Sequence, residues 1–396
     1  MPVLRHMTNA DLLAYKHLCS ICYLYKDTDP AEEQPEEKLW QKVGVFAEDG
    51  TLLSAMTQID YTARFEGQDM KLLGIGGVVS DPVARGQRGV RQMFEEGLPR
   101  LRDAGYVFSA LYPFSHQFYR KFGYEMGGVR REAVFAPSRL RRDLYCAEEI
   151  LRVLPGEDDR GMEQVYAQYA ADKNFAIRRT AEMWNDMRRG TPWDSLKHAY
   201  VLRDKGEPIA FWVGQAERGA DGSKTLVIRQ MAYAGRKGCE AIFAMLRGYN
   251  EFGKVRLQVP DEIEMRFLLE DPHDLESEWT SGGGMIRIMD VERALAMLKA
   301  PVLPGRLVVE VADGQIPQNN GRFLVEGDGY ALSVSRVEDM AADLRCTING
   351  LTALVVGIQE FEDGIRAGHG EVLSEKNLRF MSALLHQRKY YLNWAF

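Results

Sequence analysis

Two basic side chains lie in a short glycine-containing loop between a predicted strand and a predicted helix. The loop spans residues 81–89 and includes Arg85, Gly86, Arg88 and Gly89. Backbone N–H groups at the start of a helix are unpaired, and the helix dipole favours negative charge there. Together with two arginine charges, this pattern predicts binding of an anion such as a pyrophosphate. A plain turn between strand and helix is the structural alternative.

A tyrosine-containing segment follows the next predicted strand, which spans residues 106–111. Residues 118–124 read Phe-Tyr-Arg-Lys-Phe-Gly-Tyr. A tyrosine hydroxyl has an unperturbed pKa of about 10 and can act as a general acid toward a leaving group. Tyr119 and Tyr124 are the two candidates, with ordinary aromatic packing as the alternative for each. His116 is a candidate base, for which the sequence identifies no partner.

These groups require a strand, a loop, a helix and a second strand in that order. Residues 71–80 are largely apolar and predict the first strand. After the loop, apolar residues recur near helical spacing at Val90, Met93, Phe94 and Leu101. Gly97 and Pro99 interrupt this pattern, so we expect the helix to kink or end early. Further strands are predicted at 43–47, 51–61 and 128–135, which would complete one α/β domain.

The same order of elements recurs after residue 158. Strands are predicted at 200–203, 208–217, 224–233 and 255–259, with a glycine-containing turn at 235–238. This turn is shorter than the loop at 81–89, and no counterpart of residues 118–124 follows it. We therefore interpret this region as a second, degenerate domain that serves as scaffold and binds no cofactor.

A third part follows the glycines at 282–284, which we interpret as a flexible connector rather than a phosphate loop. Helical patterns are predicted there at 348–356, 359–367 and 377–385. The chain ends Tyr-Tyr-Leu-Asn-Trp-Ala-Phe, whereas termini are generally polar and mobile. So much aromatic surface predicts a buried tail that carries the α-carboxylate of Phe396 into the protein. Docking for packing alone is the alternative.

Composition limits the class of protein. The chain has 396 residues, 45% hydrophobic and 27% charged, with a formal net charge of −7. This predicts two or three globular domains, argues against nucleic-acid binding and is compatible with cationic substrates. The longest apolar run, near 351–358, is far shorter than the ~20 residues of a membrane span. Without an N-terminal signal pattern we expect a cytoplasmic protein, in which Cys19 and Cys22 are small buried residues rather than a metal or redox pair.

The loop and the tyrosine segment together resemble the GNAT acetyltransferases, in which Arg-x-x-Gly-x-Gly/Ala grips the coenzyme A pyrophosphate. Two registers are open. With Arg85 in the first position, Arg88 stands where glycine is usual and Val90 where glycine or alanine is usual. With Gly89 as the central glycine, Gly86 stands first and Arg91 last.

Over the whole chain, the order of parts resembles the Eis (enhanced intracellular survival) acetyltransferases. This resemblance implies an α/β (α+β) protein with a GNAT acetyl-CoA-binding domain at 1–137. A degenerate GNAT-like domain would follow at 138–284, and a sterol-carrier-protein-like domain with a buried C-terminus at 285–396. It also implies a homo-oligomer, a hexamer, that acetylates amines of polycationic small molecules such as aminoglycosides or polyamines.

The resemblance further implies roles for particular residues, with acetyl-CoA as co-substrate and no metal. Tyr119 would protonate the departing thiolate, and the α-carboxylate of Phe396 would deprotonate the amine. An exposed strand edge can hydrogen-bond the pantetheine amides by strand addition. The implied cofactor-binding positions are Val78, Val79, Ser80, Arg85, Gly86, Gln87, Arg88, Gly89, Val90, Arg91, Phe114 and Ser115.

Two other functions compete with small-molecule acetylation. One is a protein that binds lipid or another hydrophobic ligand through its third domain, and the other is a protein or peptide lysine acetyltransferase. The sequence contains no Gly-x-Ser-x-Gly and no Walker A loop, so hydrolase and P-loop phosphotransferase functions lack their parts. The acidic stretch at 27–37 is a candidate wall of a substrate groove, with a solvated loop as the alternative.

Overall fold

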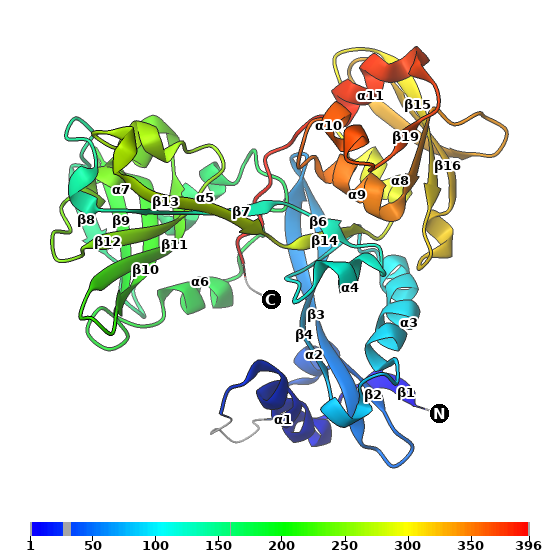
Figure 1. Ribbon diagram of the computed structural model, residues 1–396, viewed down its shortest axis with the longest axis horizontal. Coiled ribbons are helices and arrows are strands. Elements are labelled where there is room, and N and C mark those ends of the chain that lie inside the picture. Colours follow the sequence, from blue (N-terminus) through cyan, green and yellow to red (C-terminus); the bar gives the residue numbers. More distant parts are fainter. Residues whose placement is uncertain (1, 27–32, 159, 395–396) are drawn as a thin grey trace. The chain divides into compact units, whose positions relative to one another are not determined.

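The computed structural model describes residues 2–26, 33–158 and 160–394, and Figure 1 shows its helices and strands. Contacts divide the chain into two compact units. The first unit comprises Met1–Gly128, Asn174–Ile177 and Gly283–Phe396. The second unit comprises Val129–Lys173 and Arg178–Gly282. Within the described residues, no helix combines the length and the apolar composition that crossing a membrane requires.

The first unit contains a seven-stranded sheet in the order β1-β2-β3-β4-β5-β14-β6. Its strands are β1 (Val3–His6), β2 (Lys42–Phe46), β3 (Leu52–Phe65), β4 (Gln68–Ser80), β5 (Phe108–Leu111), β14 (Met285–Ile288) and β6 (Glu125–Met126). β4 and β5 run parallel, and the other neighbouring strands run antiparallel. The strands predicted at 43–47, 51–61 and 71–80 are thereby confirmed.

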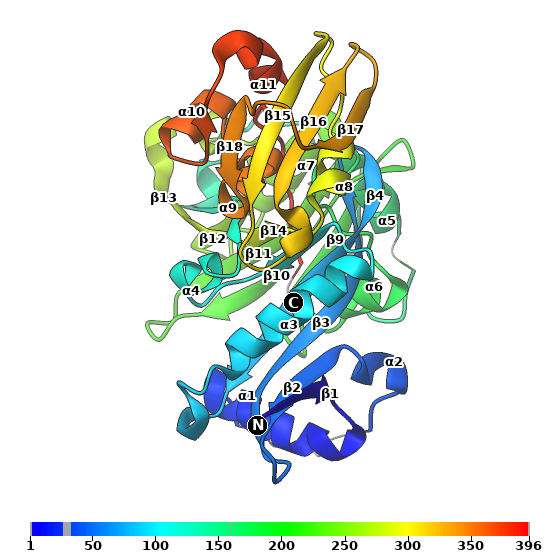
Figure 2. The ribbon, with the colours of Figure 1, turned by 90° about the vertical axis from the view of Figure 1, so that its right-hand side faces the viewer.

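Four helices accompany this sheet: α1 (Leu12–Tyr23), α2 (Glu36–Leu39), α3 (Gly89–Asp103) and α4 (His116–Arg120). α3 packs across β2, β3 and β4 (Figure 2), where Met93, Phe94 and Leu98 of its apolar face are almost fully buried. Pro99 lies inside α3, which continues to Asp103, so the helix does not end early at Gly97 and Pro99, whereas a kink there stays a prediction. Proline removes one backbone hydrogen bond, but the helix keeps a continuous buried face on both sides of it.

The second unit contains another seven-stranded sheet, in the order β13-β7-β12-β11-β10-β9-β8. Its strands are β13 (Leu275–Gly282), β7 (Val129–Phe135), β12 (Lys254–Val259), β11 (Lys224–Tyr233), β10 (Glu207–Arg218), β9 (Lys197–Asp204) and β8 (Glu149–Arg152). Its helices are α5 (Met162–Tyr169), α6 (Ala181–Arg188) and α7 (Gly235–Arg247). β11 and β12 run parallel, which repeats the arrangement of β4 and β5.

Two strands pair differently from what their sequence positions predict. The strand predicted at 128–135 is β7, but it pairs with β12 and β13 rather than completing the first sheet. β14, which the sequence places in the third domain, pairs with β5 and β6. A local pattern identifies a strand, whereas its partner is selected by packing with distant residues. The domain boundaries at 1–137, 138–284 and 285–396 therefore stay a prediction from the sequence.

The first unit also contains a five-stranded sheet in the order β17-β16-β15-β18-β19, four strands of which are labelled in Figure 2. Its strands are β15 (Gly305–Ala312), β16 (Gly321–Gly327), β17 (Leu332–Val337), β18 (Leu344–Thr347) and β19 (Glu371–Val372). Its helices are α8 (Val291–Ala296), α9 (Ile348–Val356), α10 (Phe361–Arg366) and α11 (Leu378–Leu384), the last three as predicted. A fully buried ion pair of 2.6 Å joins Arg287 of β14 to Asp313 after β15.

Candidate active site

The edge of β4 that faces β5 is open over its last residues. The parallel pairing runs from Leu72–Phe108 to Ile75–Leu111, and β4 then continues to Ser80. Among the described residues, this final stretch pairs only with β3, on the opposite side. Val79 is buried, and its neighbours Val78 and Ser80 are half-buried. An unpaired strand edge presents backbone groups that an extended amide-containing ligand can bind.

α1 supplies side chains to the same edge. The hydroxyl of Tyr23 donates a hydrogen bond to the carbonyl oxygen of Val78 at 3.3 Å. The thiol of Cys22 approaches the carbonyl oxygen of Ser80 at 3.5 Å. Sequence reasoning treated Cys22 as a structural residue and did not single out Tyr23, because no local pattern relates α1 to β4.

The predicted anion loop leads from this edge into α3. Arg85, Gly86, Gln87 and Arg88 are exposed, and α3 begins at Gly89. Among the described residues, neither arginine forms an ion pair, which leaves both charges available to a ligand. Val90 and Arg91 follow in the first helical turn, whose backbone N–H groups have no partner within the helix. The loop, the helix start and the two arginines together form a suitable cradle for a pyrophosphate.

In each of the two predicted registers, one position of the loop has a backbone environment that favours glycine. Arg88 has φ = +65°, a left-handed conformation that glycine adopts more readily than arginine. Gly89 is buried, and a Cβ atom there would lie 2.5 Å from Oγ of Ser54. Close packing therefore favours glycine at position 89, whereas an arginine adopts the left-handed conformation at position 88.

Tyr119 lies on α4 inside a cluster of aromatic rings. Its ring centroid lies 5.2 Å from Phe118, 5.4 Å from Phe114 and 6.0 Å from Phe94. Ser115 caps the helix by accepting a hydrogen bond from the N–H of Phe118, and Phe114 is 72% exposed. Burial raises the pKa of Tyr119, with smaller contributions from Tyr23 and Tyr124.

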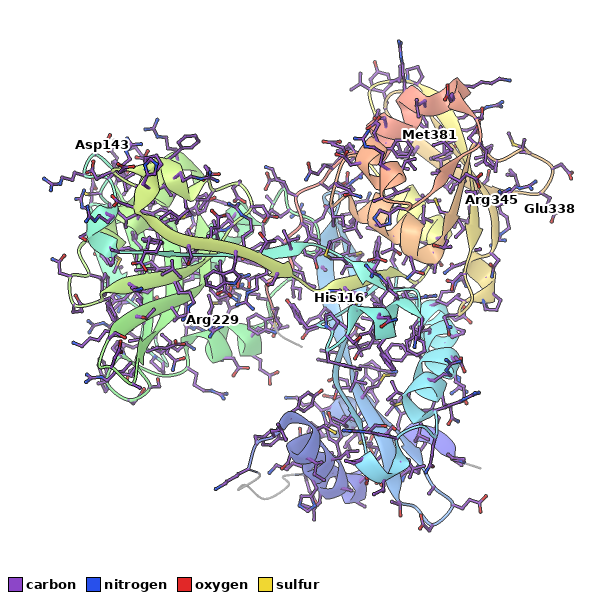
Figure 3. All side chains as sticks on the ribbon, in the orientation of Figure 1. His116, Asp143, Arg229, Glu338, Arg345 and Met381 are labelled. Atoms are coloured by element: carbon purple, nitrogen blue, oxygen red, sulfur yellow. The ribbon has the colours of Figure 1, made fainter. Side chains whose placement is uncertain are left out.

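The hydroxyl groups of Tyr119 and Tyr124 have different surroundings. Within the described part of the chain, the Tyr119 hydroxyl has no hydrogen-bond partner. The Tyr124 hydroxyl lies 2.6 Å from Oγ of Ser109, which in turn donates to the carbonyl oxygen of Leu73. His116 begins α4 (Figure 3), and its Nε2 atom is buried without a partner among the described residues. Of the two candidate acids, Tyr119 is therefore the one whose hydroxyl proton is not donated to another group of the described protein.

Over residues 390–394 the C-terminal tail is half-buried, with Leu392 alone of these buried, so a tail that carries the α-carboxylate of Phe396 into the protein stays a prediction. The ring of Tyr390 packs against Phe175 at 5.5 Å, and Leu392 is 8% exposed. The hydroxyl of Tyr112, the residue after β5, donates to the carbonyl oxygen of Leu392 at 3.1 Å. The tail therefore reaches the point where β4 and β5 separate. Phe396 lies outside the described residues, as does most of the acidic stretch at 27–37.

Known domain families match three parts of the chain. Residues 3–127 and 176–288 match two models that are each described as an acetyltransferase (GNAT) domain. Residues 291–393 match a sterol carrier protein domain. The first match ends before β7, and the second ends with β14. A search of curated proteins gave no match.

Solved structures of the same fold cover the whole chain. A GCN5-related N-acetyltransferase from Anabaena variabilis has 17% identity and a TM-score of 0.87 over 100% of both chains. A probable N-acyltransferase from Enterococcus faecalis has 18% identity and a TM-score of 0.84 over 99% of this chain and 100% of that one. Eis1 from Mycobacterium abscessus has 16% identity and a TM-score of 0.82 over 100% of both chains. GNAT domains use an acyl-CoA, and this chain is a GNAT-family N-acetyltransferase with the Eis-like architecture of two GNAT domains and a sterol carrier protein domain.

Proposed function

We propose that this enzyme transfers the acetyl group of acetyl-CoA to amines of polycationic small molecules, of the aminoglycoside or polyamine type. The observation that carries the proposal is the continuity of the open β4 edge with the basic loop at the start of α3. The edge at 78–80 suits the pantetheine amides, and the loop with Arg85 and Arg88 suits the pyrophosphate. Phe114 belongs to the aromatic cluster that holds Tyr119, and Ser115 caps α4, the helix that carries Tyr119.

In the proposed reaction, the α-carboxylate of Phe396 removes a proton from the substrate ammonium group. The free nitrogen lone pair attacks the thioester carbonyl, so that a C–N bond forms and the C–S bond breaks. Tyr119 protonates the departing thiolate, and the second proton of the attacking nitrogen restores the tyrosine hydroxyl. An amide, free coenzyme A and one proton leave the site.

The environment of Tyr119 suits this role. The Tyr119 hydroxyl is protonated at neutral pH, because its ordinary pKa is about 10 and burial raises it further, and a positioned acid or base contributes roughly 10²–10⁴-fold to a rate. The net charge of −7 and a carboxylate base both favour a cationic acceptor. The resemblance to Eis supports a homo-oligomer, which we propose to be a hexamer, and we propose the cytoplasm as its compartment. The proposed step requires no metal.

Thiol release from acetyl-CoA tests the proposal, with a panel of aminoglycosides, polyamines and lysine-containing peptides as acceptors. We expect turnover with the polycationic small molecules. Turnover of peptides alone would assign the enzyme to protein acetylation instead. A purified protein that carries lipid but binds no acetyl-CoA would contradict the proposal and favour ligand binding by the third domain.

A further inference from the structure

The turn between β3 and β4 holds a buried acidic residue in an unfavourable backbone conformation. Phe65 pairs with Gln68, so Glu66 and Gly67 form a two-residue turn with φ values of +50° and +85°. Such turns favour Asn, Asp or Gly, whereas the Cβ atom of glutamate disfavours the left-handed region. Glu66 is nevertheless only 8% exposed. Strain and burial at a hairpin corner indicate that other contacts determine the residue there.

Two side chains hold the Glu66 carboxylate. Nε of Arg388 and Nδ2 of Asn174 each donate a hydrogen bond of 2.9 Å to its Oε1 atom. The N–H of Glu66 donates to Oδ1 of Asn174 at 2.8 Å. Burial opposes ionisation of Glu66, but Arg388 and Asn174 outweigh it and lower the pKa of the carboxyl group. We call Glu66, Asn174 and Arg388 the latch.

The latch fixes the chain that leads to the C-terminus. The Arg388 guanidinium also donates to the carbonyl oxygens of Leu384 and His386, at 2.5 Å and 2.8 Å. The backbone of Asn174 continues the contact in strand-like fashion, because its N–H donates to Lys389 and its carbonyl oxygen accepts from Tyr391, both at 2.8 Å. The tail is thus held by side-chain and backbone hydrogen bonds just before it passes the end of β5.

We propose that the latch positions the C-terminal carboxylate for proton transfer, with Glu66 as a positioning residue rather than a catalytic one. This inference rests on the proposed function, which assigns the base to Phe396. Leu392 is placed by the latch and by Tyr112, and the four residues that follow it span at most ~14 Å. A shift of Leu392 would therefore displace the base, and a displacement of about 1 Å can cost roughly 10²-fold in rate.

The kinetic test uses Glu66→Gln and the double variant Glu66→Gln/Arg388→Met. The single variant leaves the charge of Arg388 buried without its carboxylate partner. If that variant misfolds for this reason, the double variant, which removes the charge as well, still tests the latch. The matched control is Lys205→Gln, because Lys205 and Gly206 form the same kind of turn between β9 and β10, with φ values of +51° and +81°. We expect the latch variants to lose about 10²-fold in kcat, with the KM for acetyl-CoA unchanged. The control should retain wild-type kinetics.

A choice of acceptors separates positioning from general instability. An amine of low pKa is already neutral at the assay pH and needs no base, so its acetylation should fall much less than that of a strongly basic amine. Equal losses for both acceptors, or wild-type kcat in both latch variants, would overturn the proposal.

A readout without turnover separates failure of the latch from failure of the proposed function. Limited trypsin digestion of the intact protein after Lys389, a site that the wild type and all variants retain, reports how firmly the tail is held. We expect both latch variants to be cut at least ten times faster than the wild type and the Lys205→Gln control. Equal cleavage would overturn the latch, whatever acceptor the enzyme uses, whereas a firm latch in a protein without turnover would count against the proposed function alone.

Discussion

Two parallel strand pairs in this chain separate in the same way, but the polar groups near them have different partners. In the first unit β4 and β5 pair as far as Ile75 and Leu111. In the second unit β11 and β12 pair as far as Ile228 and Leu257. β4 and β11 each continue beyond the last pair and lead into a helix. The scaffold that could open a strand edge to a ligand is therefore present twice.

The connection to the following helix differs between the two regions. Residues 81–88 separate β4 from α3 and carry two arginines, whereas only Ala234 separates β11 from α7. A Cβ atom on Gly238 would lie 2.2 Å from the carbonyl oxygen of Ile209. The first turns of α3 and α7 are both packed closely against a strand, at Gly89 and Gly238, but only α3 is preceded by an exposed basic loop.

The carboxyl ends of the separating strands also differ. In the second region, Tyr233 donates to Glu262 at 2.8 Å, and Nζ of the buried Lys173 lies 3.2 Å from Glu262. In the first region, the hydroxyl of Tyr119 has no partner among the described residues. The two regions therefore differ in the polar groups that the protein leaves unsatisfied rather than in the arrangement of the sheet.

The largest expected effect is that of Tyr119→Phe in the first region. We expect kcat to fall by roughly 10²–10⁴-fold, because the proton donor is lost. Acetyl-CoA affinity should stay nearly constant, because the ring packing is retained. Thiol-release kinetics and calorimetric titration measure the two quantities. Tyr233→Phe is the matched change in the second region and should leave turnover unaltered, whereas full activity of Tyr119→Phe would remove Tyr119 from the acid role.

Extension of the chain beyond Phe396 should have the next largest effect. Added residues convert the α-carboxylate into an amide, so that kcat should fall by about 10²-fold or more. The same residues added at the N-terminus are the control. An extended protein that folds, assembles and retains full activity would show that the terminal carboxylate is not the base.

Substitutions of basic residues at the starts of α3 and α7 test whether only the first of these helix starts binds acetyl-CoA. Arg85→Ala and Arg88→Ala should each weaken acetyl-CoA binding about tenfold, because a hydrogen bond to a charged group contributes roughly 1.5–3 kcal/mol. The corresponding changes at the start of α7, Arg236→Ala and Lys237→Ala, should leave the affinity unchanged. Equal losses in both regions, measured by titration, would mean that the second helix start also binds the ligand.

The smallest effect concerns the pH dependence of stability in the second region. Burial opposes ionisation of Glu262, but Lys173 and Tyr233 outweigh it and hold the pKa of this carboxyl group below its ordinary value. The ion pair therefore stabilises the fold above the unfolded pKa of about 4.3, and this contribution is lost as the pH falls through the native pKa.

Lys173→Met tests this dependence. It should lower the free energy of unfolding by about 1 kcal/mol at pH 7, because a third of the Glu262 side chain is exposed. The difference from the wild type should vanish in strong acid, and acetylation kinetics at neutral pH should not change. Denaturant unfolding at the two pH values measures it, and an equal difference at both would contradict the assignment.

Local sequence patterns were sufficient for the parts that lie close together in the chain. The strand at 71–80, the basic loop and residues 118–124 were found because strand, loop, helix and strand follow one another directly. The pairing of β7 and β14 was not predictable, because each strand joins a sheet formed mainly by distant segments. Glu66 gave no signal either, since a glutamate beside glycine in a polar turn is an ordinary surface pattern.

The sequence by itself determined the two strand–helix–strand repeats, the basic loop of the first repeat, the shorter turn of the second and the aromatic C-terminus. Each depends on residue types within a few positions of one another. The tertiary structure decided which strands share a sheet, which tyrosine hydroxyl has no partner among the described residues and how the tail is held. These outcomes arise from contacts between Glu66, Asn174 and Arg388, whose separation along the chain exceeds 300 residues at its widest. Burial makes such contacts important for stability, because a charge that is removed from water is costly unless a group of opposite charge lies beside it.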